Sequence, residues 1–300
     1  MLKIANHDIY KHPLPEGHRF PMIKYELLPR QLIHEGTCSS NNFFKPEVPD
    51  DKHILRVHTK SYYDALKHLT LDARAARKIG FPLSAALVER EVIIADGTIT
   101  ASKFALEHGV AMNIAGGTHH AYSSRGEAFC LLNDQAIGAR YLLEKQLAKK
   151  ILIVDLDVHQ GNGTAEIFQN DNAVYTFSMH GKGNYPFKKE QSDLDIALEN
   201  NANDTIYLGL LKKTLPKLIE QENPDFIYYL CGVDVLASDK LGKLAITPAG
   251  CIERDRFVLQ TCKNYQIPVM CSMGGGYSPD IKIIVEAHAN TFRMAQDIFF

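Results

Sequence analysis

The chain has 300 residues and a formal net charge of −2, from 33 basic and 35 acidic residues. With 45% hydrophobic residues it can bury a large core, and we expect a single domain over residues 1–300. No block of Lys and Arg is present that would neutralise a row of phosphates, which argues against direct nucleic-acid binding.

Cysteine usage and the first residues bear on the compartment. The six cysteines form no CxxC pair and several lie in apolar runs, which is typical of reduced, buried thiols rather than of disulfides or a thiolate zinc site. The N-terminus becomes polar too early for a signal peptide, and no apolar run approaches membrane-spanning length. The sequence therefore predicts a cytoplasmic protein without a membrane span.

The first hundred residues are the least regular part of the chain. Helices are predicted near 61–69 and 84–90, and proline-containing loops near 12–21 and 45–50. Further along, short apolar runs are each followed by Gly or polar residues and then by a helical pattern. This alternation predicts parallel strands joined by crossover helices. The runs lie at 110–121, 151–161, 173–181, 225–234 and 268–277.

Capping signals mark three of the helices. The helical pattern of 99–109 ends at Gly109, and a later helix is expected to begin with Thr247 as its cap and Pro248 in its first turn. The last helix is expected to repeat that opening at Ser278 and Pro279.

Unusual residues follow all five apolar runs. In an open parallel sheet, ligands bind beyond the carboxyl ends of the strands, so these residues predict one shared site. They are His119 and His120; Asp155, Asp157 and His159; Ser178 and His180; Asp234; and Gly274 to Tyr277.

The stretch "ILIVDLDVHQGNGT" (151–164) carries the strongest signal. In an extended segment Asp155, Asp157 and His159 face one side, and burying them together is costly unless a cation neutralises them. For Asp155 taken alone, a helix-capping role is the favoured interpretation. A catalytic metal needs about three N or O ligands, and Asp234 is the natural third, although it could also be a surface-loop carboxylate. His180 and Asp239 are weaker candidates.

Two further motifs predict catalytic groups. In "GGTHHA", the glycines at 116 and 117 allow His119 and His120 to approach one cavity, which suits proton transfer near neutral pH. In "SMGGGYS", Tyr277 could donate a hydrogen bond to a developing oxyanion. A phosphate-binding loop is the alternative there, but no matching glycine motif follows.

These motifs resemble the zinc-dependent histone deacetylase superfamily. The resemblance runs from "HPLPEGHRFP" (12–21) through "GGTHHA", "AFCLLND" (128–134), "DLDVHQGNG" and "GVDVLASDKLGKLAITPAG" to "GGGYS". It implies the three-layer arginase/deacetylase-like α/β fold, with a central, mostly parallel sheet and helices on both faces. The "HQGNG" form, where most members carry "HHGDG", and "SDKLGKLAITPAGCIERD" are most similar to class IV.

The resemblance also implies roles for individual residues. It implies zinc at Asp157, His159 and Asp234, and ligands of this type also accept ferrous iron. It also implies that Tyr277 polarises the acyl carbonyl and that His119 and His120 are the general acid/base pair, with Asp155 behind His119. Phe129 and Gly275 would line the acyl-lysine tunnel, with Arg19 at its foot. A potassium site would be formed by the Ser178 hydroxyl and the carbonyls of Asp155, Asp157, His159 and Met179.

Two positions depart from the family pattern. Asn162 stands where most members have an Asp behind the second histidine, and an amide cannot stabilise a protonated His120 as a carboxylate would. We therefore expect His120 to favour its neutral, general-base form. Ala128 stands where many members have Gly and could slightly narrow the tunnel.

The resulting functional hypothesis is a metal-dependent amidohydrolase that removes acetyl or longer acyl groups from the ε-amine of lysine. Small acylated amines such as acetylpolyamines are an alternative substrate class. An arginase-like ureohydrolase would need two manganese ions and more carboxylates than lie near Asp234. A non-catalytic acyl-lysine binder is disfavoured because both histidines and Tyr277 are present. No sequence feature identifies a protein partner.

Overall fold

The computed structural model describes residues 1–300 and contains one eight-stranded sheet in which every strand pair is parallel. The expected parallel α/β sheet is confirmed. In spatial order the strands are β2 (Phe43–Phe44), β1 (Lys3–Ala5), β3 (Val110–Asn113), β8 (Val269–Ser272), β7 (Phe226–Leu230), β4 (Ile151–Asp155), β5 (Val174–Gly181) and β6 (Leu194–Leu198).

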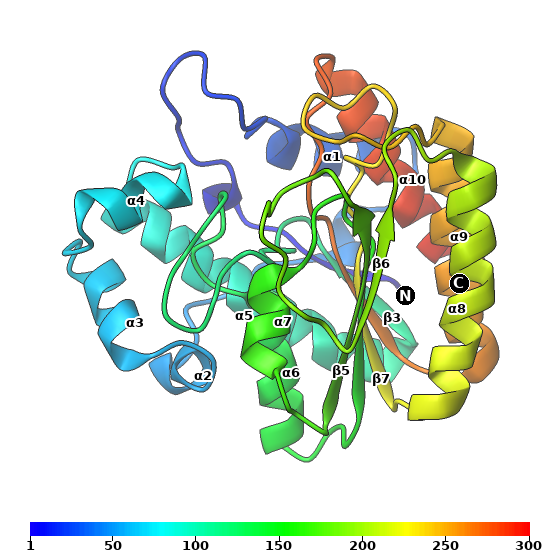
Figure 1. Cartoon of the computed structure of the whole chain (residues 1–300), viewed down its shortest axis with the longest axis horizontal. Helices are drawn as coiled ribbons and strands as arrows, with labels where there is room; N and C mark the ends of the chain where they lie inside the picture. The colour runs from blue at the N-terminus through cyan, green and yellow to red at the C-terminus, as the bar shows by residue number, and fades with distance from the viewer.

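Helices cover both faces of the sheet and complete a three-layer arrangement (Figure 1). On one face lie α5 (Ala85–His108), α6 (Asp134–Glu144) and α7 (Asn162–Phe168). On the other lie α8 (Asp204–Glu222), α9 (Pro248–Tyr265) and α10 (Ile281–Phe299), with α1 (Lys24–His34) packed against α10. The short helices α2 (Asp51–Leu55), α3 (Lys60–Lys67) and α4 (Ala73–Ile79) gather at one side of the molecule, and single 3₁₀ turns lie at Asp8–Tyr10 and Ser40–Asn42.

The four central strands are buried along their whole length. Every residue of β3, β8, β7 and β4 is inaccessible to solvent, as expected for parallel strands covered by helices on both faces. Their carboxyl ends lie side by side, and the polar segments predicted to form the site follow directly from them. The fold therefore brings these segments together at the centre of one edge of the sheet.

Two helix boundaries differ from those expected. The helices predicted at 84–90 and 99–109 are the two ends of the single 24-residue helix α5. α5 continues through Gly97. A Cβ at this position would lie only 2.5 Å from the Tyr10 hydroxyl, so close packing against Tyr10 requires a glycine. The last helix is capped by Asp280, not by Ser278, whose hydroxyl instead hydrogen-bonds Ser238 at 2.8 Å.

The helix starting at Pro248 follows the predicted pattern, with the Thr247 hydroxyl accepting a hydrogen bond from the Gly250 amide. None of the helices combines the length and the apolar character required to cross a bilayer.

Candidate active site

A single pocket of about 390 Å³ opens at the carboxyl ends of the central strands. Its walls come from the segments after β3, β4 and β8, from the loop before α1 and from the loop after β5. Of the predicted site residues, the pocket wall contains Arg19, His119, His120, Phe129, Asp157, His159, Gly275 and Tyr277. Asp155, Asn162, Ser178, Met179 and Asp234 lie buried outside the wall.

The segment after β4 is a succession of tight side-chain turns, not an extension of the strand. β4 ends at Asp155, whose carboxylate accepts a hydrogen bond from the Asp157 amide at 3.1 Å. The Asp157 carboxylate in turn accepts one from the His159 amide at 3.0 Å. Asp157 Oδ1 and His159 Nδ1 lie 3.0 Å apart, whereas Asp155 faces His119. These directions are produced by the turns and not by the pleated strand that the sequence predicts.

Asp157, His159 and Asp234 form a buried triangle of possible metal ligands. One atom from each lies within 4.8 Å of the others. Asp234 Oδ2 is fully buried without a hydrogen-bond partner, and it lies 3.2 Å from His159 Nδ1. A buried carboxylate oxygen with no donor is costly unless it faces a cation. Two carboxylates and one imidazole are a donor set that zinc and ferrous iron both accept, so these residues fit a divalent ion.

The charges of this triangle also favour a bound cation. Burial disfavours a proton on His159, but the hydrogen bond to Asp157 and the charges of Asp157 and Asp234 raise its pKa to about 10. Burial, with the neighbouring Asp157 charge, raises the pKa of Asp234 to about 7. Two carboxylates this close therefore stabilise any cation placed between them.

Gly275 approaches both carboxylates. Its amide donates to Asp157 Oδ2 at 2.8 Å and its carbonyl accepts from the Val233 amide at 2.8 Å. A Cβ at this position would lie 2.1 Å from Asp234 Oδ2 and 2.9 Å from Asp157 Oδ2. Any side chain at 275 would thus displace the ligand carboxylates, which accounts for the glycine.

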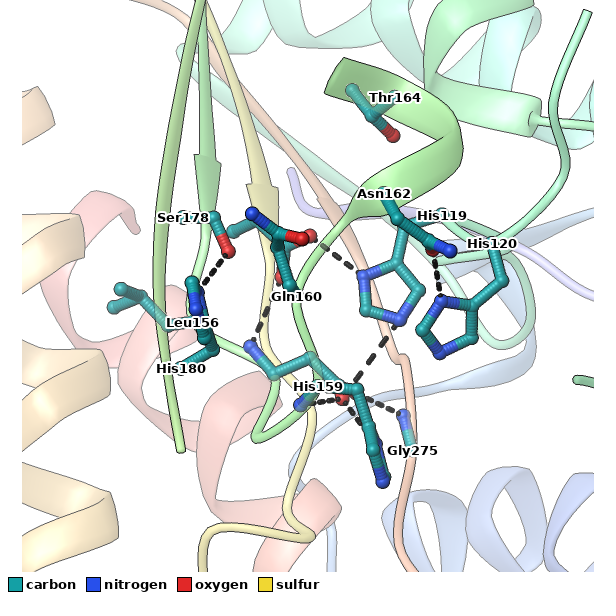
Figure 2. A network of polar contacts seen from close by, with 12 residues as sticks. His119, His120, Leu156, His159, Gln160, Asn162, Thr164, Ser178, His180 and Gly275 are labelled. Carbon is teal, nitrogen blue, oxygen red and sulfur yellow. Dashed lines mark hydrogen bonds and ion pairs between the residues drawn. The ribbon is translucent and has the colours of Figure 1, made fainter. Parts of the chain in front are cut away.

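The two histidines lie side by side (Figure 2). Their ring centroids are 4.1 Å apart, and His119 Nε2 lies 3.9 Å from Asp157 Oδ1. His119 Nδ1 is 2.6 Å from Asp155 Oδ2, whereas His120 Nδ1 is 2.5 Å from Asn162 Oδ1. The rings therefore have the same geometry but different partners, one a carboxylate and the other an amide.

This difference in partner separates the pKa values of the two rings. Burial disfavours protonation of His119, but the Asp155 carboxylate raises its pKa above the ordinary value. Burial, together with positive charge on His119 and His159, lowers the pKa of His120 well below the ordinary value. The direction for His120 agrees with the neutral form expected from Asn162.

Asn162 is held in place by a chain of hydrogen bonds. Its amide nitrogen donates to the Tyr122 hydroxyl at 3.0 Å, which donates to Glu190 at 3.1 Å. The Asn162 oxygen is therefore the atom that faces His120, so Nδ1 of His120 donates and Nε2 is left free to accept a proton.

Tyr277 lines the pocket with a hydroxyl that hydrogen-bonds no other residue. Its backbone amide donates to Asp239 Oδ2 at 2.6 Å, and the same carboxylate group accepts from the amides of Leu241 and Gly242. Asp239 therefore anchors the segment that presents Tyr277 and is not part of the ligand triangle.

Aromatic rings form the wall around Tyr277. Phe20 lies 5.2 Å from Phe129 and 6.0 Å from Tyr277 between ring centroids, and Phe81 lies 5.1 Å from Phe129. The apolar wall suits an aliphatic chain passing towards the triangle.

The prediction that Arg19 lies at the foot of the tunnel is wrong. Arg19 is exposed and its guanidinium lies 5.0 Å from the Phe129 ring centroid. The buried guanidinium on the pocket wall belongs to Arg90 of α5, which pairs with Glu91 and donates to the Tyr10 carbonyl at 2.8 Å. The loop before α1 turns Arg19 outward onto the face of the Phe129 ring, and this leaves the inner position to Arg90.

The comparisons with known proteins agree with this geometry. A model of the histone deacetylase domain matches residues 18–292. The chain belongs to the histone deacetylase family. It is 45% identical to an uncharacterised Picosynechococcus protein over 99% of both chains, and 29% identical to histone deacetylase 2 of Arabidopsis thaliana over 96% of this chain and 77% of that protein.

Solved structures of the family have the same fold. The crystal structure of a histone deacetylase homologue complexed with SAHA is 25% identical and has a TM-score of 0.86, covering 99% of this chain and 84% of that one. The predicted superfamily and its arginase/deacetylase-like fold are therefore confirmed.

In this histone deacetylase family member, the sequence did not reveal one buried cation beside the site. Lys24 is fully buried and its ammonium donates to the Gly274 carbonyl at 2.9 Å, next to the glycines that lead to Tyr277. Burial lowers the pKa of Lys24 to about 8, despite the nearby Asp234 and Asp157 charges. The available signal was its position on the apolar stripe of α1, since Lys24, Leu28 and Leu32 recur every four residues.

Two of the residues expected to hold potassium, Asp155 and Ser178, are neighbours in the sheet. Asp155 is paired with Ser178 across β4 and β5, and the Ser178 hydroxyl lies 3.0 Å from His180 Nδ1 (Figure 2). No backbone amide donates to the carbonyls of Asp157 and His159. His180 is buried, and burial lowers its pKa to about 4, so it is a neutral group outside the ligand triangle.

Proposed function

We propose that the chain is a metal-dependent amidohydrolase that removes acyl groups from the ε-amine of lysine. The observation that carries the proposal is the Asp157, His159 and Asp234 triangle, which lies beside the His119 and His120 pair at the end of an aromatic-walled pocket. These are the parts that hydrolysis of an amide needs: a cation site, a base, an acid and a channel for an aliphatic side chain.

The three ligands support one divalent ion, zinc or ferrous iron. When bound, such an ion polarises the acyl carbonyl and lowers the pKa of a water molecule. A donor set of three supports a single ion better than the pair of ions of a ureohydrolase. By resemblance to the family, potassium would be held by Ser178 and the carbonyls of Asp155, Asp157, His159 and Met179.

The histidines and Tyr277 would divide the remaining work. His120 Nε2 takes the proton of the attacking water, because its Nδ1–H is committed to Asn162. The free Tyr277 hydroxyl donates to the carbonyl oxygen as negative charge develops there. His119, which Asp155 favours in its protonated form, holds the proton that the histidine pair returns to the leaving amine. Phe129 and Gly275 complete the passage for the acyl-lysine side chain.

Finer assignments are also proposals. We assign the chain to class IV on the "HQGNG" residues. Gln160 supports this assignment, because its side-chain amide donates to the Glu190 carbonyl and its side-chain oxygen accepts from the Glu190 amide. We infer a single domain over 1–300 from the one continuous sheet. Six free, buried cysteines support a cytoplasmic location.

A turnover panel tests the proposal. Metal-depleted protein would be reloaded with zinc or with iron and given three substrates: an acetyl-lysine peptide, a myristoyl-lysine peptide and an acetylpolyamine. We expect turnover of an acyl-lysine peptide. Turnover of the acetylpolyamine alone would transfer the assignment to small amines, and binding of acyl-lysine without turnover in the metal-loaded protein would make the chain a binder.

A further inference from the structure

The outer mouth of the pocket is cationic. Arg19, Lys78 and Lys243 are exposed and line the pocket, and they come from three separate segments: the loop before α1, the last turn of α4 and the loop after β7. Asp157, at the inner end, is the carboxylate among the lining residues. The chain as a whole has a net charge of −2, so this positive sign is a local property of the mouth.

These cations are largely unneutralised. Lys243 donates to the Gly183 carbonyl at 2.8 Å and Arg19 lies over the Phe129 ring, and neither has a carboxylate partner within ion-pair distance. Lys78 lies 3.6 Å from Glu127, but that carboxylate is buried.

Glu127 is moreover shared. It also accepts from Arg125 at 3.0 Å and from the Tyr185 hydroxyl at 2.5 Å. One carboxylate thus serves two cations and a phenol, so it neutralises the charge of Lys78 only in part.

Two loops next to the mouth extend the same character. Lys188 and Lys240 in these loops are exposed without an ion pair, whereas Lys182 pairs with Glu199 at 2.6 Å. Within the loop of Lys188, Phe187 is 91% exposed and lines the pocket. The Phe187 ring is therefore free to contact a substrate residue at the rim of the pocket.

We propose that the mouth selects acyl-lysine in an acidic polypeptide segment, with an apolar neighbour for Phe187. This inference rests on the proposed deacylase function and specifies its substrate. The three cations come from separate segments around the mouth, so they can contact residues on both sides of the acylated lysine. A polyamine chain or a lysine-rich tail would place positive charge against Arg19, Lys78 and Lys243, so the mouth disfavours both.

The test compares acetyl-lysine peptides that are identical except for four flanking residues, which are acidic, neutral or basic. We expect kcat/KM to fall in that order, with acidic over basic on the order of tenfold at low salt and a smaller ratio at 0.5 M salt. The charge reversals Lys78→Glu and Lys243→Glu, combined, should invert the order of kcat/KM among the three peptides. Lys213→Glu, an exposed lysine of α8 outside the pocket, is the matched control and should leave the order intact.

The outcomes separate this inference from the deacylase assignment. Equal kcat/KM for all three peptides, or a preference for an acetylpolyamine, would overturn the inference and leave the deacylase function standing. If no peptide turned over in either its acetyl or its myristoyl form, the deacylase function would be wrong. Fluorescence anisotropy with the same peptides, labelled, would then still test the charge selectivity of the mouth. Tighter binding of the acidic peptide that is lost in the double variant supports the selectivity, and equal affinities refute it.

Discussion

Asn162→Asp is the substitution that examines the proposed proton transfer most closely. The chain contains its own reference, because His119 and His120 have nearly identical hydrogen bonds, at 2.6 and 2.5 Å, to a carboxylate and to an amide. The carboxylate raises the pKa of His119, whereas His120, without one, is held well below its ordinary value by burial and by neighbouring positive charge. A carboxylate at 162 would give His120 the same kind of partner.

The expected shift follows from that comparison. An opposite charge in hydrogen-bond contact raises a histidine pKa by about 1–3 units. A general base must be neutral, so activity is lost as the pH falls through the pKa of His120. Raising that pKa moves the acidic limb of the kcat/KM profile to higher pH by about the same 1–3 units, and below the new limb the variant loses about tenfold per unit.

The assay is kcat/KM on one acyl-lysine peptide from pH 5 to 9, with metal content measured in each sample. Asn162→Ala is the control, since it removes the hydrogen-bond acceptor without adding charge; its activity should fall without an upward shift of the limb. An unmoved acidic limb in Asn162→Asp would refute the base role of His120.

Three further predictions concern the site and the fold. Tyr277→Phe should lower kcat by about 10²–10³-fold with unchanged metal content, because its hydroxyl has no partner in the protein; loss of metal instead would contradict that role. Lys24→Met should lower kcat/KM by about ten- to a hundredfold, because the Gly274 carbonyl loses its hydrogen-bond donor. Metal affinity measured by competition should not weaken, since a nearby positive charge is removed. Weakened affinity would contradict this role of Lys24. Burial lowers the pKa of His58 to about 4, so the unfolded chain binds the extra proton between pH 6.5 and 4 and stability falls by up to about 3 kcal/mol as the pH drops through that window. In urea unfolding His58→Gln should lack this loss, and an identical pH dependence would show that His58 is not its source.

The sheet and the convergence of the site could be predicted because their signals are local. Each central strand is an uninterrupted apolar run, and the polar residues follow at its carboxyl end. The short strands β1 and β2, of three and two residues, gave no such run, and β6 is mostly half-buried. Edge strands of this kind depend on pairing with a neighbour, which a single segment does not reveal.

Side-chain direction was harder to predict than side-chain proximity. The resemblance placed Arg19 at the foot of the tunnel, yet whether it turns inward depends on the path of its loop and on the ring of Phe129. Arg90 and Lys24 were missed because long charged side chains are usually exposed, and only tertiary contacts show them to be buried. The contact between His120 and Asn162, in contrast, could be predicted because it depends only on which residue occupies position 162.

Metal titration of activity tests the central claim most directly. Metal-depleted protein would receive increasing zinc, and separately ferrous iron under anaerobic conditions, while acetate released from an acetyl-lysine peptide is measured. We predict that activity rises to a plateau at one ion per chain and that Asp234→Asn neither retains the ion nor releases acetate. Full activity without metal, or a plateau at two ions per chain, would contradict it.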